Sequence, residues 1–206
     1  MTVLAVDAGR TTCRAAVFTA GGRGATVALD SGATLTDPGG PARLAALVET
    51  CARALDDPSL RSTESLVVGA AGALSRPHAA AALADALLTT SVGAGEIVVT
   101  SDVVVAHAGA LDSAPGVVVV AGTGAVAFAV DGSGRAITVD GGGYLVGDAG
   151  SGFAVGRAGL SAAQRHRDGR AGGSAGLAAA AEREFGPLDG LAGRLHAGPD
   201  PARTVA

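Results

Sequence analysis

Residues 2–12 read Thr-Val-Leu-Ala-Val-Asp-Ala-Gly-Arg-Thr-Thr, a short apolar run that ends on a carboxylate and a polar glycine turn. The β-branched residues of this run predict a strand over 2–7. A second apolar run covers 14–18, Gly21 and Gly22 mark another turn, and a third run covers 25–29. Three strands joined by short turns predict an antiparallel meander at the start of the chain.

Helical and strand patterns alternate after this meander. One apolar stripe at helical spacing is formed by Leu44, Leu47, Val48, Cys51 and Leu55. The expected elements that follow are a strand at 66–70, a helix at 77–88, a strand at 96–100, and a helix from about 103 to 111 that is capped by Ser101 or Asp102. This alternation indicates an α/β domain.

The second half repeats the order of the first. Strands are expected at 116–121, 125–130 and 135–139, with turns at 122–124 and 131–134. We interpret this as a duplication with a boundary near 111–116, which gives domains at 1–112 and 113–206. Further helices are expected at about 175–185 and 188–196, and no closing element is expected before Ala206.

Composition excludes several classes of function. The net charge of −4 argues against a nucleic-acid binder, and all fifteen basic residues are Arg, so no lysine is present for a P-loop or a Schiff base. Cys13, Cys51 and the four histidines have no metal-ligand spacing, and the cysteines are expected to be reduced and buried. No apolar run approaches the roughly 18 residues of a membrane span, and no signal peptide is recognisable, so we expect a soluble cytoplasmic protein.

Three glycine-bearing turns follow apolar strands, at 7–12, 122–124 and 147–152. Glycine lets backbone amides approach an anion closely, and the Thr and Ser hydroxyls in these turns add donors. Asp7, Asp102 and Asp148 stand at strand ends or glycine turns, where open α/β sheets bind their ligands. Such a set suits phosphoryl transfer, although Asp102 could equally be a helix N-cap, and the two roles are compatible.

These motifs resemble the actin-like/hexokinase-like ATPases, and within them the group that unites N-acetylglucosamine kinase with the BadF/BadG/BcrA/BcrD-type ATPases. The resemblance is carried by residues 3–13, 98–102, 117–124 and 141–152. It implies an α/β, ribonuclease H-like fold with mixed sheets flanked by helices, and a second domain that is incomplete in this chain. It also implies ATP and Mg²⁺ as cofactors, a small-molecule sugar as substrate, and a homodimer as one expected assembly.

The resemblance also implies roles for individual residues. Asp102 would be the catalytic base that deprotonates the sugar hydroxyl, and Asp7 would hold Mg²⁺ through water. The expected nucleotide-binding residues are Asp7, Gly9, Arg10, Thr11, Thr12, Gly122, Thr123 and Gly124. The expected sugar-binding residues are Asp102, Thr123, Gly143 and Asp148.

The chain departs from the family pattern at several positions in these loops. Arg10 replaces a glycine, Thr12 a basic residue, Ala125 a serine, Gly142 a tryptophan and Ala149 a glutamate. Arg10 adds positive charge near the phosphates and is expected to restrict a backbone that normally uses glycine's freedom. The segment for adenosine binding is expected to be absent.

The leading hypothesis is an ATP-dependent kinase of N-acetylglucosamine or a related amino sugar. A catalytically impaired sugar- or nucleotide-binding remnant and a BadF-type ATPase are the alternatives. An ATPase that works through an iron–sulfur cluster is disfavoured, because Cys13 lies in the first phosphate loop and Cys51 on an apolar helix face.

Overall fold

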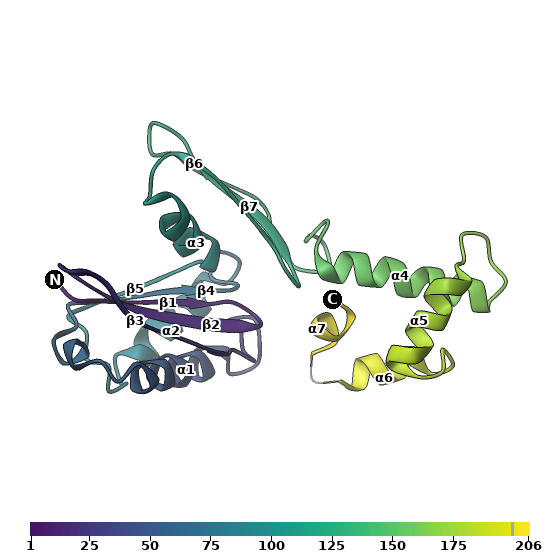
Figure 1. Ribbon diagram of the computed structural model, residues 1–206, viewed down its shortest axis with the longest axis horizontal. Helices are drawn as coiled ribbons and strands as arrows, with labels where there is room; N and C mark the ends of the chain where they lie inside the picture. Colours follow the sequence, from purple (N-terminus) through teal and green to yellow (C-terminus); the bar gives the residue numbers. More distant parts are fainter. Residues whose placement is uncertain (199) are drawn as a thin grey trace. The chain divides into compact units, whose positions relative to one another are not determined.

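The computed structural model describes residues 1–198 and 200–206 and divides into two compact units (Figure 1). Unit 1 contains Met1–Val118 and Phe128–Ile137, and unit 2 contains Val119–Ala127 and Thr138–Ala206. The division into domains at residue 112 stays a prediction.

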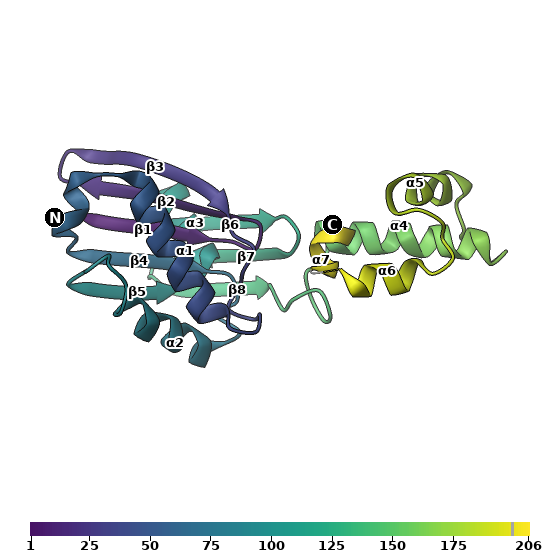
Figure 2. The same ribbon diagram turned by 90° about the horizontal axis from the view of Figure 1, so that it is seen from below.

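Unit 1 is built on a five-stranded sheet. Its strands are β1 (Val3–Ala8), β2 (Thr12–Thr19), β3 (Gly22–Asp30), β4 (Ser65–Ala70) and β5 (Glu96–Thr100). They lie in the order β3-β2-β1-β4-β5 (Figure 2). The first three strands are antiparallel, which is the predicted meander, whereas β4 runs parallel to both β1 and β5.

Helices cover both faces of this sheet. Helices α1 (Gly40–Leu55) and α2 (Pro77–Leu87) lie on one face, and α3 (Asp102–Leu111) lies on the other (Figure 1). A short 3₁₀ helix at Pro58–Ser62 precedes β4. The predicted stripe of α1 does face the core: Leu44, Val48, Cys51 and Leu55 are buried, and only Leu47 stays half-buried.

Strands β6 (Gly116–Ala121), β7 (Ala125–Val130) and β8 (Ala136–Asp140) form a second sheet in that order. The bounds of β6 and β7 are those predicted, and β8 begins and ends one residue later than predicted. In the turn between β7 and β8, Asp131 Oδ1 accepts hydrogen bonds from the backbone N–H of Ser133 at 2.8 Å and of Arg135 at 3.0 Å. These bonds explain why the chain reverses there without a longer loop.

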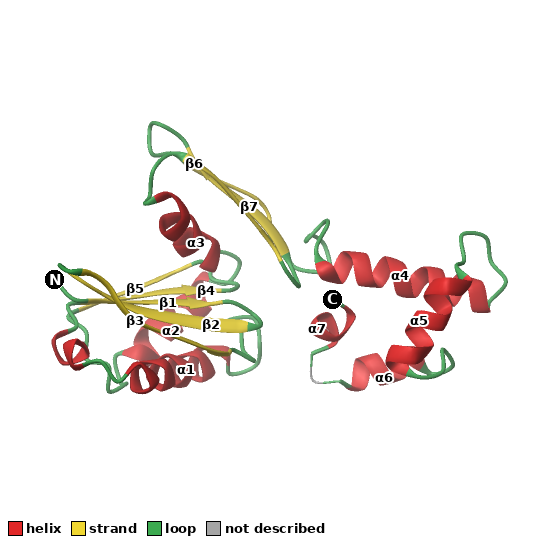
Figure 3. Cartoon of the chain, in the orientation of Figure 1, coloured by secondary structure: helices red, strands yellow, loops and turns green. Residues whose placement is uncertain are grey.

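The remaining helices belong to unit 2 (Figure 3). They are α4 (Gly152–Arg167), α5 (Ala175–Phe185), α6 (Leu191–Ala197) and α7 (Pro201–Val205). Small side chains on α4 and α5 form a core with two leucines; its members are Ala163, Ala178, Ala181, Leu188 and Leu191. Helix α5 has the predicted bounds, whereas α4 was not predicted. Helix α6 starts three residues later than predicted, because Gly190 before it adopts a left-handed φ of 71°.

No helix in the described part of the chain combines the length and apolarity needed to cross a membrane.

The two cysteines meet in the core of unit 1. Cys13 on β2 and Cys51 on α1 are both fully buried, with their sulfur atoms 3.7 Å apart. The hydrogen bond with Cys51 and burial raise the pKa of the Cys13 thiol well above its usual value. The two side chains are therefore packing residues of the core, as the sequence predicts.

Burial of this pair makes a prediction for thiol chemistry. Because thiolate character and access control reactivity, we expect neither thiol to react with iodoacetamide at pH 7.5 while the protein is folded. Mass spectrometry after unfolding in guanidinium should show both thiols alkylated. Rapid modification of the folded protein would show that the two thiols are not buried.

Candidate functional site

Asp7 is the carboxylate of β1. The register places Asp7 opposite Arg14 on β2 and opposite Gly69 on β4. Leu4, Val6 and Ala8 alternate with it and are buried against α1 and α2, so Asp7 belongs to the face that α3 covers. Its side chain is 36% exposed, and its Oδ2 atom lies 3.8 Å from Arg14 Nη1.

Asp102 is the first residue of α3, and one residue, Ser101, separates it from the end of β5. Its Oδ1 atom accepts hydrogen bonds from Ser101 Oγ and from the backbone N–H of Val103, both at 2.9 Å. The sequence left open whether Ser101 or Asp102 caps the helix. Ser101 occupies the N-cap position. Its hydroxyl accepts no hydrogen bond from a backbone N–H of the helix and instead donates one to Asp102. Both bonds use Oδ1, which leaves Oδ2 as the oxygen that could accept a proton.

Asp102 acts electrostatically on Asp7. Burial raises the pKa of Asp7, repulsion from Asp102 raises it further, and Arg14 opposes both effects. Two negative charges near one another favour a cation. The described residues hold no cluster of three or more metal-ligating side chains, so a Mg²⁺ ion at Asp7 would keep water and phosphate oxygens as most of its ligands, which is how this ion is usually bound.

Gly69 on β4 determines how closely α3 approaches the sheet. A Cβ atom on Gly69 would lie 2.9 Å from Val105 Cγ1 and would overlap Cγ2. Only glycine therefore allows Val105, one helical turn after Asp102, to lie against β4. Sequence reasoning missed this residue, although a lone glycine in a buried strand is the usual signal of such a close approach.

The first glycine turn links β1 to β2. The backbone N–H of Gly9 donates to Thr12 O at 3.1 Å, and Ser31 N–H donates to Thr11 O at 3.0 Å. Arg10 does not have a positive φ, so its side chain imposes no left-handed strain on the turn. The folded turn therefore does not use glycine's left-handed conformation at this position.

The second glycine turn belongs to unit 2 and is fastened to the start of α4. The backbone N–H of Gly152 donates to Gly122 O at 2.8 Å, and that of Phe153 donates to Thr123 O at 3.3 Å. Helix α4 begins here because the fully buried Ser151 caps it and accepts a bond from Ala154 N–H at 3.1 Å. Sequence reasoning missed this cap, although Ser151 followed by a helix was its signal.

Asp148 lies beside this second turn. Asp148 is buried, with 9% of the residue exposed. A Cβ atom on Gly124 would lie 2.8 Å from Asp148 Oδ2. The Asp148 carboxylate therefore packs closely against Gly124, and its assignment to the sugar stays a prediction. Gly143 makes the tight bend of the same loop: it has a φ of 83°, and its carbonyl accepts bonds from Val146 N–H and Gly147 N–H.

The structure therefore brings the predicted site residues together in two groups. Asp7, Asp102 and the turn from Gly9 to Thr12 belong to unit 1. The turn from Gly122 to Gly124, Gly143 and Asp148 belong to unit 2. Each group contains a glycine turn and at least one carboxylate.

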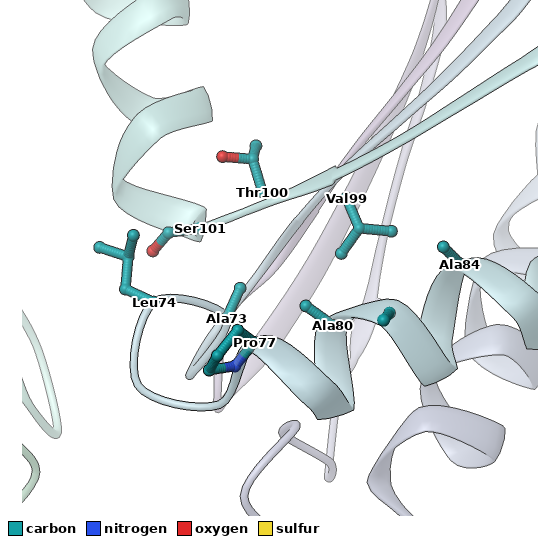
Figure 4. Close-up of a pocket in the computed structure, with 9 residues that line it drawn as sticks. Ala73, Leu74, Pro77, Ala80, Ala84, Val99, Thr100 and Ser101 are labelled. Atoms are coloured by element: carbon teal, nitrogen blue, oxygen red, sulfur yellow. The ribbon is translucent and has the colours of Figure 1, made fainter.

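An apolar hollow of about 370 Å³ lies in unit 1 beside the start of α3 (Figure 4). Its wall is formed mainly by α2 and the end of β5, and includes Leu74, Pro77, Val99 and Ser101. Neither Asp7 nor Asp102 lines it, and its surface offers few polar groups to a sugar or a phosphate. The hollow therefore lies close to the start of α3 but includes neither carboxylate.

The strand order, the doubled strand–turn–strand pattern and the carboxylates at strand ends define an α/β protein of the ribonuclease H-like, actin-like ATPase fold. The chain belongs to the BadF/BadG/BcrA/BcrD ATPase family, whose model matches residues 4–182. Membership of this ATPase family implies that the nucleotide is ATP.

Two solved structures share the fold. One is a protein from Chromobacterium violaceum assigned as an N-acetylglucosamine kinase, with a TM-score of 0.76 and 22% identity over 99% of this chain and 70% of that chain. The other is a protein from Porphyromonas gingivalis with the same assignment, with a TM-score of 0.72 and 19% identity over 98% of this chain and 69% of that chain. No curated protein sequence matches this chain significantly.

The close approach at Gly69 can be tested by substitution. We expect Gly69→Ala to lower the free energy of unfolding by about 1–3 kcal/mol, because the added methyl group overlaps Val105. The double variant Gly69→Ala/Val105→Ala removes the overlapping atoms, and urea unfolding should show it to be more stable than the sum of the two single changes predicts. Strict additivity would show that the two residues are not in contact.

The repulsion at Asp7 makes a prediction for stability. The pKa of Asp7 is raised in the folded protein and stays near its ordinary value of 3.8 in the unfolded chain. Wild type therefore loses stability as the pH rises from 3.8 through the raised pKa, and Asp7→Asn avoids this loss. We expect Asp7→Asn to have the higher melting temperature at pH 7, and the difference to disappear below about pH 3.

Asp57 provides a control of opposite sign. Hydrogen bonds from Ser59 lower the pKa of the Asp57 carboxyl. Asp57→Asn should therefore destabilise the protein at pH 7. If both substitutions changed the melting temperature in the same direction, the electrostatic account of Asp7 would be wrong.

Proposed function

We propose that the protein is an ATP-dependent kinase of an amino sugar of the N-acetylglucosamine or glucosamine type, with Asp102 as the general base. The observation that carries the proposal is the carboxylate of Asp102, which is fixed through Oδ1 at the start of α3 and is close enough to Asp7 to raise the pKa of that group. Family membership supplies the nucleotide, and the assignments of the two fold relatives suggest the class of sugar.

In this proposal Asp102 accepts the proton of the sugar hydroxyl as that oxygen bonds to the γ-phosphorus and the bond to the ADP oxygen breaks. Fixing Oδ1 with two hydrogen bonds orients Oδ2 and limits the reorganisation that proton transfer requires. The remaining assignments are phosphate binding by the turns at 9–12 and 122–124, and sugar binding by Thr123, Gly143 and Asp148.

Asp7 would hold Mg²⁺ through water in the same proposal. A divalent cation offsets the charge of the transferring phosphoryl group. It would also relieve the repulsion between Asp7 and Asp102, whose mutual effect is already visible in the raised pKa of Asp7. Arg14, 3.8 Å from Asp7, favours the ionised form that binds the cation.

The alternative is a protein that binds sugar or nucleotide and transfers phosphate poorly or not at all. The observation that favours it is the replacement of the usual glutamate by Ala149 and of the usual tryptophan by Gly142, next to the sugar-binding candidates. Ala149 has no carboxylate to add to that of Asp148, and Gly142 has no aromatic face for a sugar ring.

The decisive experiment compares two Asp→Asn variants at opposite ends of α3. We expect Asp102→Asn to lower kcat in a coupled ADP-release assay by about 10²–10⁴-fold, because a general base is lost. Asp112, the C-cap residue directly after α3, has a φ of 48° and is the matched control, since Asn also tolerates this backbone conformation. Asp112→Asn should retain full activity.

The assay should cover a panel of hexoses and amino sugars. Turnover that is stimulated by sugar and survives Asp102→Asn would refute the mechanism. ATP hydrolysis that no sugar stimulates would favour an ATPase, and calorimetric sugar binding without turnover would favour the binding protein.

A further inference from the structure

We propose that Asp140 is a positioning residue that holds the loop 141–151 in the conformation in which Asp148 binds the sugar. This inference rests on the proposed function, because Asp148 is there assigned to the sugar. Nothing in the sequence singled out Asp140, which lies outside the glycine motif that follows it.

The carboxylate of Asp140 joins the two ends of the loop. Asp140 is the last residue of β8, and its Oδ1 atom accepts a hydrogen bond from the backbone N–H of Asp148 at 2.6 Å. Its Oδ2 atom accepts a bond from the backbone N–H of Ala149 at 2.8 Å. One side chain at the start of the loop thus binds two successive amides at its end.

The loop is closed tightly around this carboxylate. A Cβ atom on Gly147 would lie 2.5 Å from Asp140 Oδ1 and 3.0 Å from the backbone nitrogen of Gly142. Gly141 N–H donates to Ala125 O at 3.0 Å, which ties the first residue of the loop to β7. The start of the loop is therefore fixed by the sheet, and its end is fixed by Asp140.

The negative charge of Asp140 strengthens its hydrogen bonds to the loop amides. The amides of Asp148 and Ala149, with smaller effects from Gly142 and Gly141, lower the pKa of the Asp140 carboxyl. An ionised acceptor makes the stronger type of hydrogen bond, and the lowered pKa keeps Asp140 ionised well into the acid range.

Asp148 needs such support because its backbone is in an uncommon conformation. Its φ of 60° lies in the left-handed region, which costs energy for a residue other than glycine. The bond from its N–H to Asp140 stabilises this conformation, and the conformation in turn directs the Asp148 side chain against Gly124. Asp140 thus acts on the sugar site through Asp148 and does not need to touch the sugar.

Asp140→Gly isolates the effect of the carboxylate. Asp140 has a φ of 63°, which glycine adopts without strain, so this variant removes both acceptors and leaves the backbone conformation accessible. We expect the KM for the amino sugar to rise about tenfold, the effect of losing hydrogen bonds to a charged acceptor, while the KM for ATP stays unchanged. Asp140→Asn keeps one acceptor oxygen and should give an intermediate KM.

Asp131 provides the matched control at the other end of the β7–β8 hairpin. It also accepts two backbone amides through a carboxylate with a lowered pKa, but these bonds close only the turn before β8. Asp131→Asn should leave the KM for the sugar at the wild-type value. Equal effects of Asp131→Asn and Asp140→Asn would overturn the inference, because the change would then reflect general loosening of the hairpin.

Hydrogen exchange read by mass spectrometry separates this inference from the proposed function. In Asp140→Gly the amides of residues 148 and 149 should exchange faster than in wild type, whether or not the protein phosphorylates a sugar. If wild type neither phosphorylates nor binds a sugar while Asp140→Gly still shows the faster exchange, the proposed function and the role in sugar binding are refuted together. Unchanged exchange, or an unchanged sugar KM in an active enzyme, would overturn the role of Asp140 directly.

Discussion

The place of Asp102 depends on the distance between α3 and β4. Val105 can lie against the sheet only because Gly69 has no side chain, and Asp102 stands one turn before Val105 on the same helix. A methyl group on β4 would displace the start of α3, and with it the carboxylate whose Oδ1 atom is fixed by Ser101 and Val103. The proposed chemistry of unit 1 therefore depends on the apolar packing of the Val105 side chain against Gly69.

The negative charge of Asp7, on the strand next to β4, is electrostatically unfavourable. Burial and Asp102 disfavour the charged form of Asp7, and Arg14 compensates only in part. Carboxylates in such positions lower the stability of a folded protein unless an opposite charge compensates them. The glycine turn and Asp148 of unit 2 follow a different pattern, in which backbone amides and tight packing hold the acidic side chains.

Much of the fold could be predicted because local pattern and tertiary packing agree in the strands. Apolar runs bounded by glycine define β5, β6 and β7 with the observed bounds, and the stripe on α1 is the buried face. Helix α4 was not predicted because its sequence contains three glycines and has no long apolar stripe. Its start is fixed by the buried cap residue Ser151. A lone glycine in a buried strand was the signal for Gly69, but its partner could not be read from the sequence because Val105 lies 36 residues away. Asp140 had no such signal, since it acts through amides eight and nine residues away. The roles of the site residues themselves stay predictions.

The burial of both thiols also has a practical consequence for spectroscopy. A single cysteine introduced at an exposed position, for example at Arg61 in unit 1 or Arg170 in unit 2, would be the one accessible thiol of the chain. Fluorophores or spin labels could then be attached at chosen pairs of sites in the otherwise native protein. Distances between the two units could be followed as nucleotide and sugar are added, with no need to remove Cys13 or Cys51 first.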